Sequence, residues 1–382
     1  MKAFDVVVVG ARVAGAATAL HLARAGHDVL IVDRVGPPAD TISTHALMRS
    51  GVLSLQRANV LDRVVEAGTP EIRQVGLVFG SEQISFPVAD EWGVDAYYAP
   101  RRTVLDAVLL DVAMEAGVTF ISGLSVTSVL RAEGGRVAGV SVRTAEGDAS
   151  ISARQVVGAD GTNSRIAREV EAPTLYFSKA TNAVVYSYFQ GIPTSGYDFR
   201  FLNHRNVGLI PTNDGLSLLF VGGPLSEAPV DSEEYLITTL RRVAPDLAEA
   251  VGSATRTERF YRAKGIPNLL RDPGGEGWSL VGDAGFTEDP IAAHGITDAL
   301  RDAELCAEAV STSLRDPSLE VEAKSRYREV RNRFADSLLE ATVPLANFEW
   351  DGAEASQLLR KIGEVAEDEC ELLTSRSTFS LV

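Results

Sequence analysis

The sequence is poor in the residues that build metal and disulfide sites. Among its 382 residues there are two cysteines, Cys306 and Cys370, and five histidines. Two scattered cysteines are too few for a disulfide framework or a zinc cluster, and the histidines lack ligand spacings such as H-E-x-x-H. The sequence therefore predicts no metal centre.

Long hydrophobic runs and an excess of positive charge are also missing. No apolar run approaches the roughly 18 residues that a membrane span needs, and the run Val6 to Val9 is too short for a signal-peptide core. Lysine and arginine number 36 against 52 aspartates and glutamates, a net charge of −16. This balance disfavours nucleic acid and anionic membranes as partners. With 45% hydrophobic and 23% charged residues, we expect a cytoplasmic α/β protein with a large core.

A strand, a glycine-containing turn and a helix begin the chain. Val6 to Val9 is typical of a buried parallel strand, and a helix is expected over about residues 14–25. In this context Gly10 and Gly15 match a G-x-G-x-x-G dinucleotide fingerprint: the first glycine permits the tight turn, and the last lets helix and strand pack closely. Arg12 replaces the middle glycine, so its side chain must point away from the ligand or reach the phosphates as a cation. A second strand, 28–33, ends at Asp33, near the usual offset of about 20 residues for a ribose-binding carboxylate.

Two later segments repeat this arrangement of strand, glycine and aspartate. The first contains Gly158-Ala159-Asp160-Gly161 and leads into a helix. The second contains Gly282-Asp283-Ala284, continues through Pro290 and leads into a helix of about 297–314. In a parallel sheet, such strand ends lie at one edge, where an extended ligand can bind across them.

With three such motifs in this order, the sequence resembles the FAD-dependent aromatic hydroxylases of the para-hydroxybenzoate hydroxylase class, the single-polypeptide flavoprotein monooxygenases. The family's middle motif, G-A-D-G-x-x-S-x-x-R, is matched at Gly158, Asp160, Gly161, Ser164 and Arg165. The resemblance covers residues 4 to about 314. It implies an α/β fold with a Rossmann-like FAD-binding domain on a parallel sheet, interleaved with a substrate domain on a mostly antiparallel sheet, plus C-terminal helices.

The expected domains are discontinuous in sequence. The FAD-binding segments are 1–72, 100–172 and 272–318, the substrate-domain segments are 73–99 and 173–271, and the C-terminal helices occupy 319–382. Strands of the antiparallel sheet are expected at 75–79, 84–86, 183–190, 197–202, 206–211 and 216–221. Their aromatic residues are candidates to line the substrate pocket, with packing of the sheet core as the alternative: Tyr186, Tyr188, Phe199, Phe201 and Phe220.

The resemblance also implies roles along the cofactor. It assigns Gly10 and Gly15 to the pyrophosphate, Asp33 to the adenosine ribose and Asp283 to the ribityl or pyrophosphate stretch. Asp160 would serve the FAD phosphates and, in this family, NAD(P)H. Arg102 would contact a phosphate or the flavin, with Arg101 as its competitor. The full expected set of cofactor-binding residues is Gly10, Arg12, Ala14, Gly15, Asp33, Arg34, Arg102, Asp160, Gly282, Asp283, Pro290, Gly295 and Ile296.

Four residues are candidates for the chemistry itself. A helix that begins near Gly295 and Ile296 points backbone N–H groups at the negative charge that develops on the reduced flavin. His294 precedes this helix and His45 follows the second strand; each touches the reaction space or makes a structural hydrogen bond. Ala293 and Thr297 depart from the family, which commonly has glycine and asparagine there. His21 and His27 are expected at the surface.

The function that the resemblance implies is an FAD-dependent monooxygenase. It would hydroxylate a small hydrophobic or aromatic substrate with dioxygen through a flavin hydroperoxide, and NADH or NADPH would be the reductant. The chain has a single dinucleotide fingerprint, which fits transient docking of nicotinamide and equally a protein that never uses it.

Three rival functions stay open at this point: a flavin-dependent reductase or dehydrogenase of a C=C bond, a halogenase, and a non-redox flavoprotein. Trp92, Trp278 and Trp350 do not form the Trp-x-Trp-x-Ile-Pro pattern expected of halogenases, and the Tyr-x-Trp-x-Phe-Pro pattern of the geranylgeranyl reductases is also missing. The acidic, amphipathic C-terminal helices, about 319–345 and 354–372, are expected to cap the core, with homodimerisation as an alternative.

Overall fold

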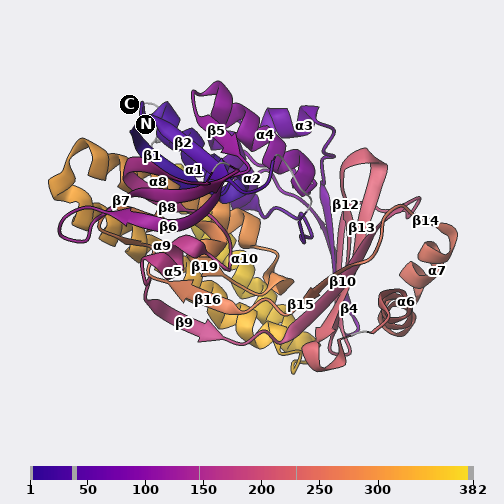
Figure 1. The fold of residues 1–382 in the computed structure, drawn as a ribbon. Coiled ribbons are helices and arrows are strands. Elements are labelled where there is room, and N and C mark those ends of the chain that lie inside the picture. The colour runs from indigo at the N-terminus through magenta and orange to yellow at the C-terminus, as the bar shows by residue number, and fades with distance from the viewer. Residues whose placement is uncertain (1–2, 37–40, 146, 229, 377–382) are drawn as a thin grey trace.

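The computed structural model describes residues 3–36, 41–145, 147–228 and 230–376. Two large sheets lie at an angle to each other, and helices pack on and between them (Figure 1). This architecture confirms the expected fold class: an α/β protein with a parallel-containing sheet, a second, mostly antiparallel sheet and C-terminal helices. The segment bounds given above stay a prediction, and their outermost parts, 1–2 and 377–382, lie outside the described residues.

The first sheet is built around β1, whose valines Val6 to Val8 are fully buried. Strands β18, β8, β1, β2 and β5 lie in this order and run parallel. Burial on both faces explains why β1 and β2 show valine runs without polar alternation. The strands of this sheet are β1 (Phe4–Val9), β2 (Val29–Asp33), β5 (Thr119–Ser122), β6 (Ser125–Arg131), β7 (Val137–Thr144), β8 (Gly147–Gly158), β17 (Gly274–Gly275) and β18 (Trp278–Leu280).

Helix α1 (Val13–Arg24) packs against α4 (Arg102–Glu115) and α8 (Gly295–Arg315) as well as against the sheet. Because its surroundings cover it on several sides, the expectation that His21 lies at the surface is wrong. The His21 side chain is buried, and burial lowers its pKa to about 4. His27 is half-buried, and its Nε2 shares a hydrogen bond of 2.7 Å with the Ser311 hydroxyl.

The second sheet alternates between two buried faces along β10. Val184, Tyr186 and Tyr188 belong to the cluster on the face toward the first sheet, whereas Val185 and Phe189 pack under α6 and α7 on the other face. Side chains that alternate between the two faces are the pattern that a strand imposes, and here both faces are buried. All neighbours are antiparallel except β11 and β3. The strands are β3 (Gln74–Phe79), β4 (Glu82–Pro87), β10 (Asn182–Gln190), β11 (Tyr197–Leu202), β12 (Arg205–Pro211), β13 (Leu216–Pro224), β14 (Thr255–Arg256) and β15 (Tyr261–Lys264).

A small third sheet joins the two larger ones through β19 (Phe286–Thr287), β16 (Asn268–Arg271) and β9 (Thr174–Ser178). Helices α6 and α7 lie on the outer side of the second sheet, away from the first (Figure 1). The remaining helices are α2 (Arg49–Arg57), α3 (Leu61–Glu66), α5 (Arg165–Glu169), α6 (Ser232–Val243), α7 (Pro245–Ser253), α9 (Glu320–Ala346) and α10 (Gly352–Ser375), with 3₁₀-helices at η1 (Asn213–Gly215), η2 (Leu225–Glu227), η3 (Gly282–Ala284), η4 (Pro290–Ala292) and η5 (Pro317–Leu319).

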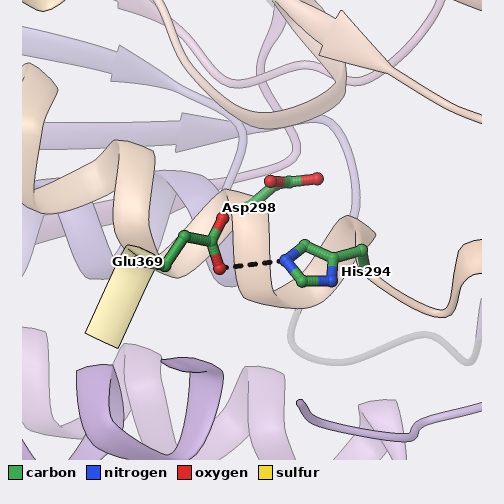
Figure 2. A group of neighbouring side chains, drawn as sticks. All are labelled: His294, Asp298 and Glu369. Carbon is green, nitrogen blue, oxygen red and sulfur yellow. Dashed lines mark hydrogen bonds and ion pairs between the residues drawn. The ribbon is translucent and has the colours of Figure 1, made fainter. Parts of the chain in front are cut away.

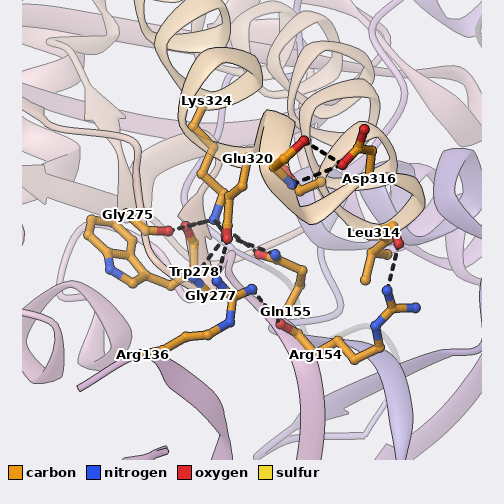
Figure 3. A network of polar contacts seen from close by, with 12 residues as sticks. Arg136, Arg154, Gln155, Gly275, Gly277, Trp278, Leu314, Asp316, Glu320 and Lys324 are labelled. Atoms are coloured by element: carbon orange, nitrogen blue, oxygen red, sulfur yellow. Dashed lines mark hydrogen bonds and ion pairs between the residues drawn. The ribbon is translucent and has the colours of Figure 1, made fainter. Parts of the chain in front are cut away.

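Lys324 links α9 to the first sheet through hydrogen bonds (Figure 3). Its Nζ is buried and donates to Glu320 Oε1 at 2.7 Å, to Gln155 Oε1 at 3.0 Å and to the carbonyls of Trp278 and Gly275 at 2.9 and 2.5 Å. Glu320 also accepts from the backbone N–H of Gly277 at 2.9 Å. The buried charges are therefore paired and hydrogen-bonded, which is the condition under which they are tolerated inside a protein.

In the part of the chain that the structure describes, none of the helices combines the length and apolar character needed to cross a lipid bilayer.

Candidate functional site

A cavity of about 590 Å³ lies at the carboxyl edge of the parallel sheet. Its walls come from the segments that follow β1, β2, β8 and β18 and from the N-terminus of α8. The structure thus brings together most of the residues that the sequence singled out. Those that line the cavity are Gly10, Arg12, Ala14, Asp33, Arg34, His45, Arg102, Asp160, Asp283, Pro290, His294, Gly295 and Ile296. Gly15 and Gly282 are not among the lining residues. Gly15 lets α1 pack on the Gly10 turn, and Gly282 lets the third motif pack on Ala14 of α1.

The first turn requires glycine at two positions. Gly10 has a φ of +110°, and an added Cβ would lie 2.3 Å from the carbonyl oxygen of Ala159. A Cβ on Gly15 would lie 1.9 Å from the carbonyl oxygen of Gly10. The N-terminus of α1 therefore packs directly on the turn, and among the described residues no side chain caps it. Its unsatisfied N–H groups suit a phosphate.

Asp33 and Arg12 border this turn from two sides. Asp33 accepts hydrogen bonds from the backbone N–H groups of Ala11 at 2.8 Å and Val35 at 2.9 Å. These bonds fix the carboxylate at the end of β2 and leave its remaining lone pairs for a ligand. Arg12 is exposed to the cavity, and its guanidinium donates to the Thr41 hydroxyl at 3.2 Å. Its side chain therefore reaches along the cavity wall, as one of the two sequence-based alternatives required.

Asp160 holds the middle turn together. Its carboxylate accepts from the Ser164 hydroxyl at 2.6 Å and from the backbone N–H groups of Arg165 and Ile166 at 2.6 and 3.2 Å. An ionised carboxylate only accepts hydrogen bonds, so it has no donor to offer to a phosphate. A contact of this segment with FAD, which stays a prediction, would therefore run through backbone N–H groups.

The two neighbouring arginines at the start of α4 take different places. Arg102 lines the cavity and binds the buried Asp106 carboxylate, with N–O distances of 3.0 to 3.1 Å. Arg101 instead pairs with Glu258 at 2.6 Å, and its guanidinium lies 4.2 Å from the ring centre of Tyr188. Of the two, Arg102 is therefore placed to meet a bound ligand.

The third motif forms the wall opposite α1. Gly282 has a φ of +58°, and an added Cβ would lie 2.7 Å from the Cβ of Ala14. Asp283 is accessible from the cavity, but the surrounding protein desolvates its carboxyl and raises its pKa. Ala293 is left-handed, with a φ of +52°, a backbone region that glycine adopts more readily than alanine. Thr297 does not line the cavity; it is buried, and its Oγ1 accepts from the Met48 N–H at 3.4 Å.

His45 is a neutral, buried group at the cavity wall. Its φ of +68° is left-handed, and its Nε2 shares a hydrogen bond of 2.5 Å with the Tyr188 hydroxyl. Burial, together with the charges of Arg102 and Arg101, lowers the pKa of His45 to about 3. Its Nδ1 has no hydrogen-bond partner among the described residues, so a bound ligand can meet it.

His294 is the opposite case, a buried histidine held in a charged cluster (Figure 2). Its Nε2 donates to Glu369 Oε2 at 2.9 Å. Burial alone would lower the pKa of His294, but the charge and hydrogen bond of Glu369, together with the charges of Asp298 and Glu288, outweigh burial and raise it to about 9. Burial would raise the pKa of Glu369, but the charges of His294 and Arg301 lower it to about 2. The pair is therefore ionised at neutral pH.

One oxygen or nitrogen each from His294, Asp298 and Glu369 lies within 4.8 Å of the others, a spacing that resembles a cation site. The guanidinium of Arg301 already pairs with Glu369, and it lies 2.8 Å from Asp298 and 2.7 Å from Asp302. This side chain supplies the positive charge that a metal ion would bring.

The aromatic residues of the second sheet do not line the cavity. Tyr186, Tyr188 and Phe220 are buried in the cluster between the sheets, and Phe201 packs with Phe79 and Trp350. The alternative of core packing therefore describes them better than the pocket-lining one. Two of them reach a cavity residue through their hydroxyls: Tyr188 meets His45 Nε2, and Tyr186 accepts from the Ser43 N–H at 3.3 Å.

Sequence reasoning missed Glu369. A signal was present, because Ile362, Val365, Ala366, Cys370 and Leu373 form the buried stripe of α10, and Glu369 falls on the same stripe at helical spacing. A carboxylate on a buried stripe needs a partner, and it has His294, Arg301 and the Ser50 hydroxyl, the last at 2.5 Å.

Comparisons with known proteins agree with this geometry. Residues 3–342 match the protein family described as FAD binding domain. The chain is 28% identical over 345 residues to digeranylgeranylglycerophospholipid reductase 2 of Methanopyrus kandleri, covering 85% of this chain and 81% of that protein. It is 27% identical over 363 residues to menaquinone reductase of Mycobacterium tuberculosis, covering 87% and 83%. The structure of PqsL from Pseudomonas aeruginosa in complex with 2-aminobenzoylacetate superposes with a TM-score of 0.80 at 22% identity, covering 94% of this chain and all of that one.

Proposed function

From the premise that this chain belongs to the FAD binding domain family of FAD-dependent oxidoreductases, we propose that it is a monooxygenase. It hydroxylates a small hydrophobic or aromatic substrate, with NADH or NADPH as the reductant and dioxygen as the oxygen source.

One observation carries the proposal: a single cavity of about 590 Å³ that extends from the Gly10 turn to the N-terminus of α8. The residues present fit FAD. The turn before α1 would hold the pyrophosphate, Asp33 the adenosine ribose and Asp283 the ribityl chain. The N-terminus of α8 would then face the isoalloxazine ring. The steric requirement for glycine at Gly10 and Gly282 supports this placement, because both keep the backbone close enough to form the wall.

The two-electron uptake and the activation of dioxygen are the chemistry that FAD supplies when bound. The protein's part is electrostatic. Gly295 is open, with nothing within 4 Å of an added Cβ, and in the described chain no side chain caps α8. The N–H groups of Gly295 and Ile296 can therefore stabilise negative charge at the ring, and His294 adds a full positive charge beside them.

The opposite wall is suited to the substrate. His45 stays neutral well below physiological pH, so it can accept or donate a hydrogen bond without adding charge. The Tyr188 hydroxyl orients its ring through Nε2. A phenol, or another small ring with one polar substituent, would have one uncharged hydrogen-bonding partner at His45 Nδ1. The surroundings of this atom are otherwise desolvated.

Product analysis tests the proposal. The purified FAD-loaded protein is reduced with NADH or NADPH without oxygen, and ¹⁸O₂ and candidate phenols are then added. We expect one ¹⁸O atom in the product for each NAD(P)H consumed. Release of all reducing equivalents as hydrogen peroxide, whatever aromatic is supplied, would refute hydroxylation.

A C=C reductase is the second candidate. The observation that favours it is the match over 85% of the chain to a protein named digeranylgeranylglycerophospholipid reductase. The reduced protein would then be oxidised by an isoprenoid alkene in the absence of oxygen, and a hydroxylase would not be. A flavoprotein that never uses its flavin for redox chemistry would show neither reaction.

A further inference from the structure

Helix α10 places a charged group behind the wall of the cavity, although the helix lies beyond the region that matches the family, residues 3–342. Glu369 is completely buried, and its two oxygens accept hydrogen bonds from three groups, one on α2 and two on α8 or its N-cap residue. Oε2 accepts from His294 Nε2 at 2.9 Å and from the Ser50 hydroxyl on α2 at 2.5 Å, and Oε1 accepts from Arg301 on α8. This arrangement places a carboxylate from the C-terminal helix directly behind His294.

We propose that Glu369 is a positioning residue of the active site, which holds the imidazolium of His294 in place at the N-terminus of α8. His294 thereby presents a fixed positive charge and an unused N–H to the ring end of the cavity. The inference rests on the proposed function for the identity of the group that meets His294.

The hydrogen-bond pattern supports this role. His294 lines the cavity and is completely buried, and its Nδ1 has no hydrogen-bond partner among the described residues. An imidazolium has N–H donors on both nitrogens. With Nε2 used by Glu369, the Nδ1–H is left for a bound group, and a buried donor of this kind is costly unless such a group meets it.

The surrounding charges explain why the proton on His294 needs Glu369. His294 is faced by Asp298 and Arg301 from its own helix, by Glu288 from the segment before η4 and by Glu369 from α10. Burial raises the pKa of Asp298 to about 7 and that of Glu288 well above its ordinary value. Glu288 therefore gives little negative charge at neutral pH, and Asp298 gives only part of one. Arg301 is neutralised in part by Asp302, which leaves Glu369 as the main counter-charge of His294.

Histidine titration by NMR tests the proposal without any turnover. In the protein labelled with ¹⁵N-histidine, the His294 signal, identified by its loss in His294→Gln, should titrate near pH 9. In Glu369→Gln, which keeps an oxygen for the hydrogen bond but removes the charge, it should titrate below pH 6.5. The matched control is Glu367→Gln, an exposed position on the same helix, which should leave the titration unchanged.

Ser50→Ala provides a milder perturbation if Glu369→Gln does not fold. It removes one hydrogen bond to the carboxylate and keeps the charge, so His294 should titrate at a pH between those of the wild type and Glu369→Gln. A His294 signal that titrates at or below pH 6.5 in the wild type, or one that none of these variants moves, would overturn the proposal. Because no substrate is used, these outcomes are distinct from a failure of the hydroxylation assay.

The flavin midpoint potential at pH 7 is the second readout. Loss of a positive charge near the ring should disfavour its reduction, so the potential should fall in Glu369→Gln and in His294→Gln. If Glu369 acts through His294, the double variant should have the same potential as His294→Gln. An unchanged potential, or two decreases that add, would refute the positioning role, because a structural role would not give this non-additive pattern.

Discussion

Replacing Gly15 by alanine tests the close packing of α1 on the first turn. In a helix, glycine to alanine is ordinarily stabilising by about 1 kcal/mol. At Gly15, however, the new Cβ would lie 1.9 Å from the Gly10 carbonyl oxygen, whereas ordinary contacts begin near 3.4 Å. Helix and turn must therefore separate by about 1.5 Å. Overpacking of this kind costs about 1–3 kcal/mol, so we expect the sign of the stability change to reverse.

The displacement should also weaken FAD binding. A shift of this size moves the N–H groups of α1 out of hydrogen-bond reach of a pyrophosphate, and we expect the dissociation constant to rise at least tenfold, or about 1.4 kcal/mol. Urea unfolding of the apoprotein and fluorescence titration with FAD measure the two effects separately.

Gly363→Ala is the matched control, because Gly363 also lies in a helix but nothing is within 4 Å of its added Cβ. This variant should be more stable than the wild type and bind FAD equally well. If Gly15→Ala behaves in the same way as Gly363→Ala, the packing argument is refuted.

Three further outcomes are expected. Gly10→Val and Asp283→Ala should each purify largely free of flavin by absorbance; full occupancy in both would contradict the assignment of these residues to FAD. Lys324→Met should destabilise the protein by about 1.5–3 kcal/mol in urea unfolding, because it removes one of the two cations of the Glu320 carboxylate and leaves Arg136 as the other, whereas the exposed control Lys361→Met should change little. The pKa of Glu320 is held near 2 by hydrogen bonds and charges that outweigh its burial, so its contribution is complete above pH 4.5 and is lost as the pH falls toward 2. In Glu320→Gln this part of the acid-induced loss of stability should be missing.

The local features of the fold could be predicted from the sequence because each depends on neighbouring residues. The valine run of β1 predicted a buried parallel strand, and the run of β-branched and aromatic residues along 183–190 predicted β10, within one residue of its observed bounds. The glycines of the first turn were predicted for the steric reason that the structure shows.

Features that depend on distant parts of the chain could not be predicted in the same way. His21 was expected at the surface because its helix was considered alone, without α8 packed against it. The aromatic residues of the second sheet were offered as pocket residues because a period of two does not tell which buried face meets a ligand. Glu369 was overlooked because its partner lies 75 positions away in the chain, and no local pattern links the two.

The long separation between Glu369 and the Gly10 turn has a consequence for biosynthesis. The turn leaves the ribosome well before residue 369, and the charged cluster at the cavity is complete only after that residue has emerged. An unfinished nascent chain would thus lack the counter-ion of His294, and the finished pocket would appear late. Cofactor capture should accordingly follow the emergence of residue 369, and a flavin-loaded molecule is one in which α10 has already docked.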